Sequence, residues 1–186
     1  MHDKINEILF RALRVGGMPS KLEVQGLCQD DAKRPDEVTI FAWSEGKNVA
    51  WEVTCADTVC QSHIAGTFRE AGKAAEEAKT AKLNTYNELT RDFDVIPVAM
   101  ETFGSWGQLG IKFIRQIGDR MATKTGDKQS RYHLLQQISI GSAKMQHCFN
   151  YGHPTRPKTM GQDIPYVINQ LFFIYHCDKT NSAIST

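Results

Sequence analysis

Two ionisable side chains occur where the sequence pattern predicts apolar surfaces. In the segment 48–55, Val49, Trp51 and Val53 fall on one face of a predicted strand, and Glu52 lies on the other face between Ala50 and Thr54. In the segment 65–90, a helical stripe of apolar residues has Lys82 near its middle. The stripe comprises Phe68, Ala71, Ala75, Ala78, Lys82, Tyr86 and Leu89. Because the burial of one isolated charge is costly, Glu52 and Lys82 are expected to have partners.

A structural ion pair, or a lysine whose ammonium reaches solvent, is the simplest explanation for these two charges. A third carboxylate suggests a catalytic alternative. Asp36 begins the strand that is expected to pair with the Glu52 strand, and a hairpin can bring these two carboxylates together. Two carboxylates suit Mg²⁺, and a lysine beside them can hold a water or stabilise charge on a phosphate. This combination is typical of a metal-dependent phosphodiesterase.

The elements that must position these residues alternate between helical and strand patterns. The first helix is followed by a short strand, a hairpin with a turn at SEGKN, and a long helix whose phase predicts that Tyr86 is buried and Lys73 exposed. Pro97 places the next strand at a sheet edge or a bulge. The predicted helices are 3–15, 65–90, 105–123 and 130–147, and the predicted strands are 21–25, 37–43, 48–55 and 93–100. This order predicts an α/β or α+β domain with a mixed sheet.

Composition predicts one globular domain at 1–147, followed by an irregular and flexible tail at 148–186. The net charge of +1 gives no general basic field, so contacts with nucleic acid would need local basic patches. The N-terminal segment lacks the apolar core of a signal peptide, and the longest apolar run, 166–177, is too short to span a bilayer. The five cysteines show no paired spacing, so we expect them to be free thiols. We therefore expect a non-membrane, intracellular protein.

Three motifs together resemble a known nuclease family. KRPD (33–36), WEVTCADT (51–58) and KLNTY (82–86) are similar, in this order, to segments of the restriction-like endonucleases of the PD-(D/E)XK superfamily. The closer resemblance is to the endonuclease at the C-terminal end of some non-LTR retroelement reverse transcriptases. PVAMETFGSWG (97–107) and QQISI (136–140) also resemble retroelement-derived segments, so the resemblance covers roughly residues 1–145.

This resemblance implies a restriction-endonuclease-like core, with a central mixed sheet flanked by helices, and a Mg²⁺- or Mn²⁺-dependent activity that nicks DNA. It implies catalytic roles for Asp36, Glu52, Lys82 and Tyr86, and metal ligation by Asp36 and Glu52 together with an earlier acid, for which Glu23 fits the motif order better than Glu7. The implied partners are DNA and the reverse transcriptase part of a retroelement protein, and the implied location is the nucleus. The chain itself lacks the Tyr-x-Asp-Asp polymerase motif.

The sequence departs from the family pattern at several positions. Thr54 stands where the superfamily more commonly has its lysine, and the retroelement enzymes resemble this chain in placing the lysine on the helix. Glu52 replaces the more frequent aspartate, and Glu37 stands where the family often has glycine. These departures leave a second interpretation open, in which the chain is an inactive relic of the nuclease fold that binds DNA or a protein.

Other polar groups have simpler explanations. Five histidine and cysteine residues could act as zinc ligands, but their spacing fits no common zinc finger. Chance clustering in the tail explains them better: His147, Cys148, His153, His176 and Cys177. Basic residues on the predicted helices can contact phosphates, although solvated helix faces are the more economical interpretation: Arg69, Lys73, Lys112 and Arg115.

Overall fold

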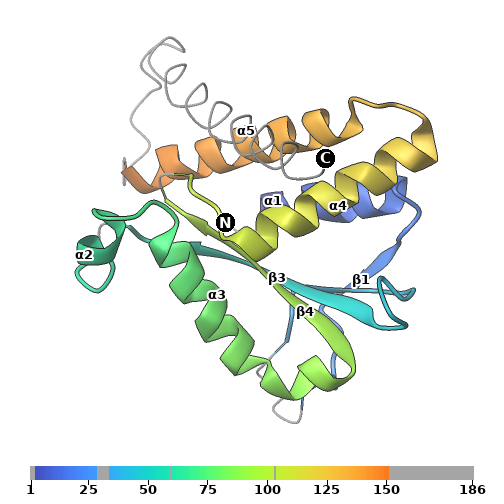
Figure 1. The fold of residues 1–186 in the computed structure, drawn as a ribbon, viewed down its shortest axis with the longest axis horizontal. Coiled ribbons are helices and arrows are strands. Elements are labelled where there is room, and N and C mark those ends of the chain that lie inside the picture. The colour runs from blue at the N-terminus through green and yellow to red at the C-terminus, as the bar shows by residue number, and fades with distance from the viewer. Residues whose placement is uncertain (1–2, 29–33, 59, 103, 151–186) are drawn as a thin grey trace, which may run out of the picture.

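The computed structural model describes residues 3–28, 34–58, 60–102 and 104–150, with side chains as far as residue 142 (Figure 1). Within these residues the chain forms a mixed α/β structure. The elements are α1 (Asp3–Val15), β1 (Ser20–Leu22), β2 (Glu37–Thr39), β3 (Asn48–Ala56), α2 (Ile64–Thr67), α3 (Lys73–Thr85), the 3₁₀ helix η1 (Asn87–Arg91), β4 (Phe93–Glu101), α4 (Gln108–Thr125) and α5 (Ser130–Asn150).

The four described strands form one mixed sheet in the order β1-β2-β3-β4. The pairs β1–β2 and β2–β3 are antiparallel, as the predicted hairpin requires, and β3–β4 is parallel. A parallel pair needs a long connection, which α2, α3 and η1 supply. Pro97 lies in β4, which is an edge strand, and the edge position predicted for this proline is confirmed.

Helices cover both faces of the sheet. The helices α1, α4 and α5 pack together over one face, and α3 packs on β3 and β4 from the other (Figure 1). On the first face, Trp51 and Phe113 are fully buried and their ring centroids are 5.8 Å apart. Two glycines allow close packing of α4, since a Cβ would lie 3.1 Å from Cα of Val98 at Gly110 and 2.7 Å from Cα of Arg131 at Gly118. The prediction of a mixed sheet flanked by helices is therefore confirmed.

The predicted continuous helix at 65–90 is wrong. The chain instead forms α2, a break at 68–72, α3 and η1. Gly72 has φ 88°, a left-handed conformation that a continuous helix cannot contain. Phe68, assigned to the buried stripe, is 92% exposed, whereas Tyr86 is buried and Lys73 is exposed, as the helical phase predicted. The phase is thus correct within α3 and fails before it.

The remaining boundaries differ from prediction in small ways. The first helix, 3–15, is confirmed, but β1 ends at Leu22, because Glu23 turns away with φ 40°. Helix α5 continues to Asn150, so the first three residues of the predicted tail are helical. The rest of that tail, 151–186, lies outside the described residues, as does most of the soft-ligand cluster, and the side chains of 147 and 148 are not described. Within the described part of the chain, no helix is long and apolar enough to cross a membrane.

Candidate active site

The strand register places Asp36 and Glu52 opposite each other. Glu37 pairs with Trp51 in the antiparallel ladder, so the preceding residue, Asp36, comes opposite Glu52. Side chains alternate along a strand, so both residues belong to the face opposite Trp51, which is the face that α3 covers. The Asp36 carboxylate is anchored to β3, since its Oδ2 accepts a hydrogen bond of 2.8 Å from the backbone N–H of Val53.

Lys82 reaches this face from α3. Its ammonium forms an ion pair with Oε1 of Glu52. The Lys82 side chain is 32% exposed and that of Glu52 is 15% exposed, so the pair lies at the edge of the interior and is accessible from solvent. The second carboxylate oxygen of Glu52, Oε2, is buried and has no hydrogen-bond partner among the described residues. A buried carboxylate oxygen without a partner is costly, and a cation or a donor from a ligand would satisfy it.

Tyr86 directly follows α3 and forms a hydrogen bond with the segment that carries Asp36. Its hydroxyl donates a hydrogen bond of 2.9 Å to the carbonyl oxygen of Arg34, and its ring packs with Cys28 and Leu89 in a small separate core. Burial raises the pKa of the Tyr86 hydroxyl, the Glu52 carboxylate beside it raises this pKa further through a hydrogen-bond interaction and its charge, and the charge of Asp36 adds to the increase. A phenol that stays protonated is a hydrogen-bond donor rather than a general base. The hydrogen bond to Arg34 gives Tyr86 a positioning contact with the Asp36 segment.

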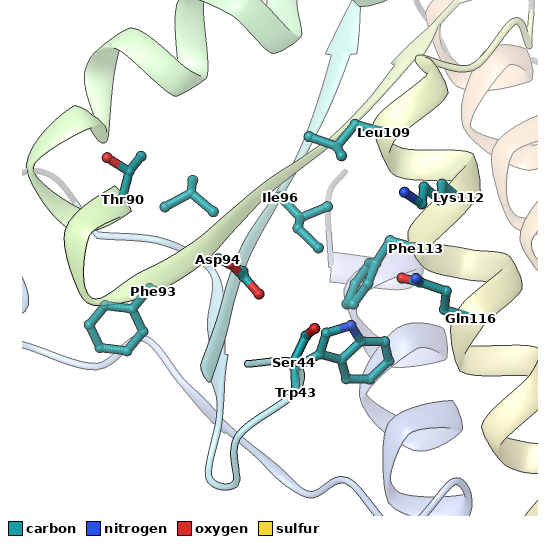
Figure 2. Close-up of a pocket in the computed structure, with 11 residues that line it drawn as sticks. Trp43, Ser44, Thr90, Phe93, Asp94, Ile96, Leu109, Lys112, Phe113 and Gln116 are labelled. Carbon is teal, nitrogen blue, oxygen red and sulfur yellow. The ribbon is translucent and has the colours of Figure 1, made fainter. Parts of the chain in front are cut away.

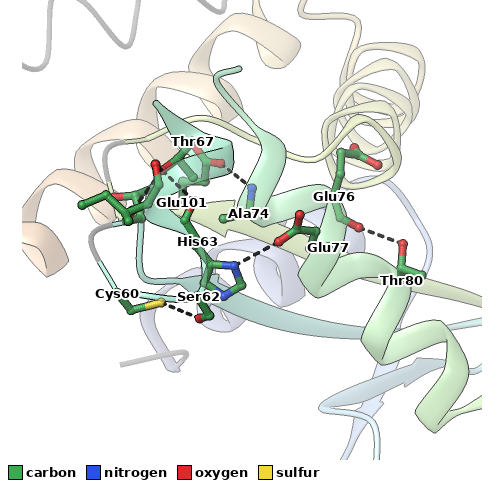
Figure 3. Close-up of polar contacts among 11 residues, drawn as sticks. Cys60, Ser62, His63, Thr67, Ala74, Glu76, Glu77, Thr80 and Glu101 are labelled. Carbon is green, nitrogen blue, oxygen red and sulfur yellow. Dashed lines mark hydrogen bonds and ion pairs between the residues drawn. The ribbon is translucent and has the colours of Figure 1, made fainter. Parts of the chain in front are cut away.

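Two carboxylates from other elements cap the helices around the site. Oε1 of the buried Glu101, at the end of β4, accepts a hydrogen bond of 2.9 Å from the N–H of Ala74 in the first turn of α3 (Figure 3). Oε1 of Glu76, on α3, accepts one of 2.7 Å from the N–H of Gln108 at the start of α4. A carboxylate at a helix N-terminus satisfies free N–H groups and interacts well with the helix dipole. These contacts, which the sequence analysis did not identify, fix α3 and hence Lys82 relative to the sheet.

The two other acidic residues considered from sequence do not join Asp36 and Glu52 in a group of three metal-ligating side chains among the described residues. Glu23 is exposed, and its backbone N–H donates a hydrogen bond of 2.9 Å to the carbonyl oxygen of Asp36. Glu7 is on α1, on the other side of the sheet, where it pairs with Lys4 and Arg11. No group of three or more His, Cys, Asp or Glu side chains that could hold a metal ion occurs in the described residues. Glu23 therefore does not complete a three-carboxylate group with Asp36 and Glu52.

Glu37 is fully buried on the opposite face of the sheet, beside Trp51. Its Oε2 accepts a hydrogen bond of 2.8 Å from the hydroxyl of Ser20, and its Oε1 has no partner among the described residues. Burial raises the pKa of Glu37 to about 7, the Ser20 hydroxyl opposes this increase, and the charge of Asp36 adds to it. The carboxyl group of Glu37 thus lies on the opposite face of the sheet from Glu52, although the charge of Asp36 still acts on it.

A separate hollow of about 340 Å³ lies between the hairpin turn, the start of β4 and α4 (Figure 2). Trp43, Ile96 and Phe113 supply its apolar wall, and Asp94 and Lys112 are among its polar groups. Neither Asp36, Glu52 nor Lys82 lines it. The hollow is therefore distinct from the carboxylate pair.

Asp36 and Glu52 are the two described carboxylates near Lys82 that could hold a divalent metal. Asp36 and Glu52 supply carboxylates from neighbouring strands, and the unpartnered Oε2 of Glu52 is a free oxygen ligand. Mg²⁺ commonly takes one or two protein carboxylates and completes its shell with water and substrate phosphate. The Lys82 ammonium, beside the same carboxylate, can donate hydrogen bonds to a water or to a phosphate oxygen.

Comparison with known proteins adds no further assignment. No protein-family model matches the sequence, and no curated protein matches it.

Proposed function

We propose that this chain is a metal-dependent DNA endonuclease that nicks its substrate, built on a restriction-endonuclease-like core and derived from a retroelement. The observation that carries this proposal is the convergence of Asp36, Glu52 and Lys82 on one face of the sheet, with one buried oxygen of Glu52 unpartnered. The three residues are also those that the sequence motifs single out. The mixed sheet between two helical layers is consistent with the fold that the resemblance implies.

In this proposal each residue has a separate task. Asp36 and Glu52 hold Mg²⁺ or Mn²⁺, and Val53 and Tyr86 keep the Asp36 segment in place. The metal, when bound, polarises the scissile phosphate and acidifies a water. Lys82 donates hydrogen bonds to the attacking water or to a phosphate oxygen and so stabilises the charge that develops in the transition state. Its ion pair with Glu52 keeps the ammonium beside the proposed metal-binding carboxylate before substrate binds.

The proposed substrate is DNA, and the proposed partner is the reverse transcriptase part of a retroelement protein, which would extend the 3′ end that a nick leaves. Both point to action in the nucleus.

A plasmid-nicking assay tests the activity. The unaltered chain should convert supercoiled DNA into the open-circular form with Mg²⁺ or Mn²⁺ and should not do so with a chelator present. Asp36→Asn and Glu52→Gln should abolish nicking and weaken metal binding measured by calorimetry, because each removes a charged ligand. Glu23→Gln is the matched control, since the Glu23 side chain is exposed and its contact with Asp36 is made by the backbone N–H, which this change leaves in place. Nicking that persists in the Asp36 and Glu52 variants would overturn the proposal.

A second candidate, the inactive DNA- or protein-binding module, is favoured by two observations. The Lys82 ammonium already neutralises Glu52, and the described acids provide two rather than three carboxylates near it. In that case the ion pair is structural, the unaltered chain nicks no DNA, and it binds Mg²⁺ no more tightly than the Glu52→Gln variant does.

A further inference from the structure

The charges of the described residues are divided unevenly between two parts of the fold. In residues 3–18 and 108–142, which contain α1, α4 and the described side chains of α5, nine lysine and arginine residues outnumber four acidic residues, for a formal charge of +5. In the other described residues, thirteen acidic residues outnumber eight lysine and arginine residues, for a formal charge of −5. The helices α1, α4 and α5 therefore form a basic layer over one face of the sheet (Figure 1).

Two adjoining hollows lie along α4 at the side of this basic layer. The hollow of about 340 Å³ described above and a second hollow of about 210 Å³ share Trp43, Ser44 and Gln116 in their walls (Figure 2). Lys112 lines the first hollow, and Arg120 lines the second. Together the two hollows form an open groove between α4 and the hairpin turn.

Polar side chains follow one another along α4 beside this groove. Lys112, Gln116, Arg120 and Lys124 are spaced four residues apart, so each lies about 6 Å further along the helix and only about 40° around it from the one before. An added Cβ at Gly17, just after α1, would lie 3.6 Å from Cε of Lys124, so the row continues from the groove to the end of α1. We call these four residues of α4 the α4 stripe.

Arg120 is held in position without a carboxylate partner. Its Nη2 donates a hydrogen bond of 2.8 Å to the carbonyl oxygen of Trp43, and its Cζ lies 4.0 Å from the centroid of the Trp43 ring. The neighbouring acid, Asp119, pairs with Arg131 instead. A guanidinium has five N–H donors and matches the geometry of a phosphate, so the donors that Trp43 does not use can bind an anion.

The groove keeps a positive charge when the acids around it are counted. The segments that line or adjoin it, 43–47, 90–96 and 109–124, contain six lysine and arginine residues and four acidic residues, for a formal charge of +2. Two of these acids are already paired, Asp92 with Arg91 and Asp119 with Arg131. The three cations of the α4 stripe have no ion-pair partner among the described residues.

The chemistry of the α4 stripe favours a nucleic acid over a lipid surface. None of the described large apolar side chains that are exposed lies on α4, so this helix lacks an apolar face to insert into a membrane. Gln116 and Ser44 add neutral donors, and such groups contact phosphates together with lysine and arginine. From Lys112 to Lys124 the stripe extends about 18 Å along the helix axis, a length over which duplex DNA presents several phosphates.

We propose that the α4 stripe is a DNA-binding surface, in which Lys112, Arg120 and Lys124 neutralise backbone phosphates of a duplex. The contacts are to phosphates, so this binding is independent of base sequence. The proposal rests on the function proposed above only for its ligand, DNA. It requires no cleavage, and it applies equally to the inactive DNA-binding module.

Fluorescence anisotropy with a labelled DNA duplex of roughly two helical turns tests the stripe, with the full chain in a chelator so that the duplex stays intact. Lys112→Gln with Lys124→Gln removes two exposed cations. This double variant should bind the duplex about 10- to 100-fold more weakly at roughly 100 mM salt. The dependence of log K on log salt should become shallower by about 1.8, because two phosphate contacts are lost.

Lys21→Gln with Lys73→Gln is the matched control, since it removes two exposed lysines from the acidic part of the fold. It changes the net charge by the same amount and should bind the duplex as the unaltered chain does. Equal weakening by the two double variants, unchanged binding by the stripe variant, or failure of the unaltered chain to bind the duplex would each overturn the proposal. Stripe-dependent binding to phosphatidylserine vesicles, with duplex binding that does not depend on the stripe, would also overturn it.

The nicking assay of the unaltered chain reports the proposed function independently. Duplex binding that depends on the stripe, together with absence of nicking by the unaltered chain, would support the stripe and reject the endonuclease. Nicking by the unaltered chain, with duplex binding that the stripe variant leaves unchanged, would do the reverse.

Discussion

Lys82 on α3 pairs with Oε1 of Glu52 on β3 across thirty residues of sequence, while Oε2 of the same carboxylate is buried without a partner. One carboxylate thus joins a helix to the sheet through one oxygen and leaves its second oxygen buried without a hydrogen bond from the described residues. The ion pair can be structural, catalytic or both. Measurements of stability and of nicking on the same variants separate these roles.

Lys82→Ala is expected to reduce nicking about 100- to 1000-fold, because it removes one electrostatic stabiliser of the transition state. The free energy of unfolding should fall by about 1 kcal/mol or less, since both partners are partly exposed to solvent. Lys79→Ala is the control, because Lys79 forms a comparable pair with Glu76 on the same helix and should leave nicking unchanged. A clear loss of stability that Lys82→Met with Glu52→Leu restores, in a chain that does not nick, would favour the inactive module.

Tyr86→Phe should lower the free energy of unfolding by about 1 kcal/mol, since it removes one hydrogen bond, to the Arg34 carbonyl oxygen. Nicking should decrease by no more than about tenfold, as expected when a positioning contact of this size is lost. Urea unfolding and the plasmid assay measure the two effects, with Tyr132→Phe as a control at an exposed tyrosine. A hundredfold loss with an altered pH profile would show instead that Tyr86 acts directly in the reaction.

Glu37→Gln should remove part of the pH dependence of stability. Burial raises the pKa of Glu37 from 4.5 to about 7, so the unfolded chain releases this proton at lower pH than the folded chain does. The stability that protonated Glu37 provides is present below pH 4.5 and is lost as pH rises to about 7, by up to about 3 kcal/mol.

Urea unfolding at about pH 5 and about pH 8 measures this contribution. The unaltered chain should be less stable at the higher pH, and the Glu37→Gln variant should show a smaller difference. If the free energy of unfolding changes by the same amount between these two pH values in both proteins, ionisation of Glu37 is not linked to folding.

Glu101→Ala should destabilise the fold by about 1–2 kcal/mol, because it leaves the N–H of Ala74 without its cap at the start of α3. Glu101→Gln should cost less, since an amide oxygen still accepts this hydrogen bond. Thermal melting and amide exchange at Ala74 report the change, and Glu70→Ala, at an exposed position, is the control. Exchange at Ala74 that is as slow in Glu101→Ala as in the unaltered chain would contradict the capping role.

Local patterns in the sequence determined much of the fold. The alternation of Val49, Trp51 and Val53 with polar residues predicted β3 and its buried face, and the spacing of apolar residues predicted α1 within its observed bounds. Pro97 indicated an edge strand, and β4 is at the edge. These signals depend on residues only a few positions apart, so they survive without knowledge of the rest of the chain. The same patterns singled out Glu52 and Lys82 as residues that needed partners, and the predicted hairpin added Asp36.

Tertiary structure alone decided how these elements meet. The helix predicted at 65–90 breaks before Gly72, and the Glu101 carboxylate caps α3 from 27 residues away. The Tyr86 hydroxyl donates a hydrogen bond to the Arg34 carbonyl oxygen, 52 residues away in sequence. Glu37 is buried on the face of the sheet that carries Trp51, opposite the face of Glu52. Apolar periodicity does not identify such partners, because a cap, a strand register or a buried carboxyl group is stabilised by groups that only the folded chain brings together.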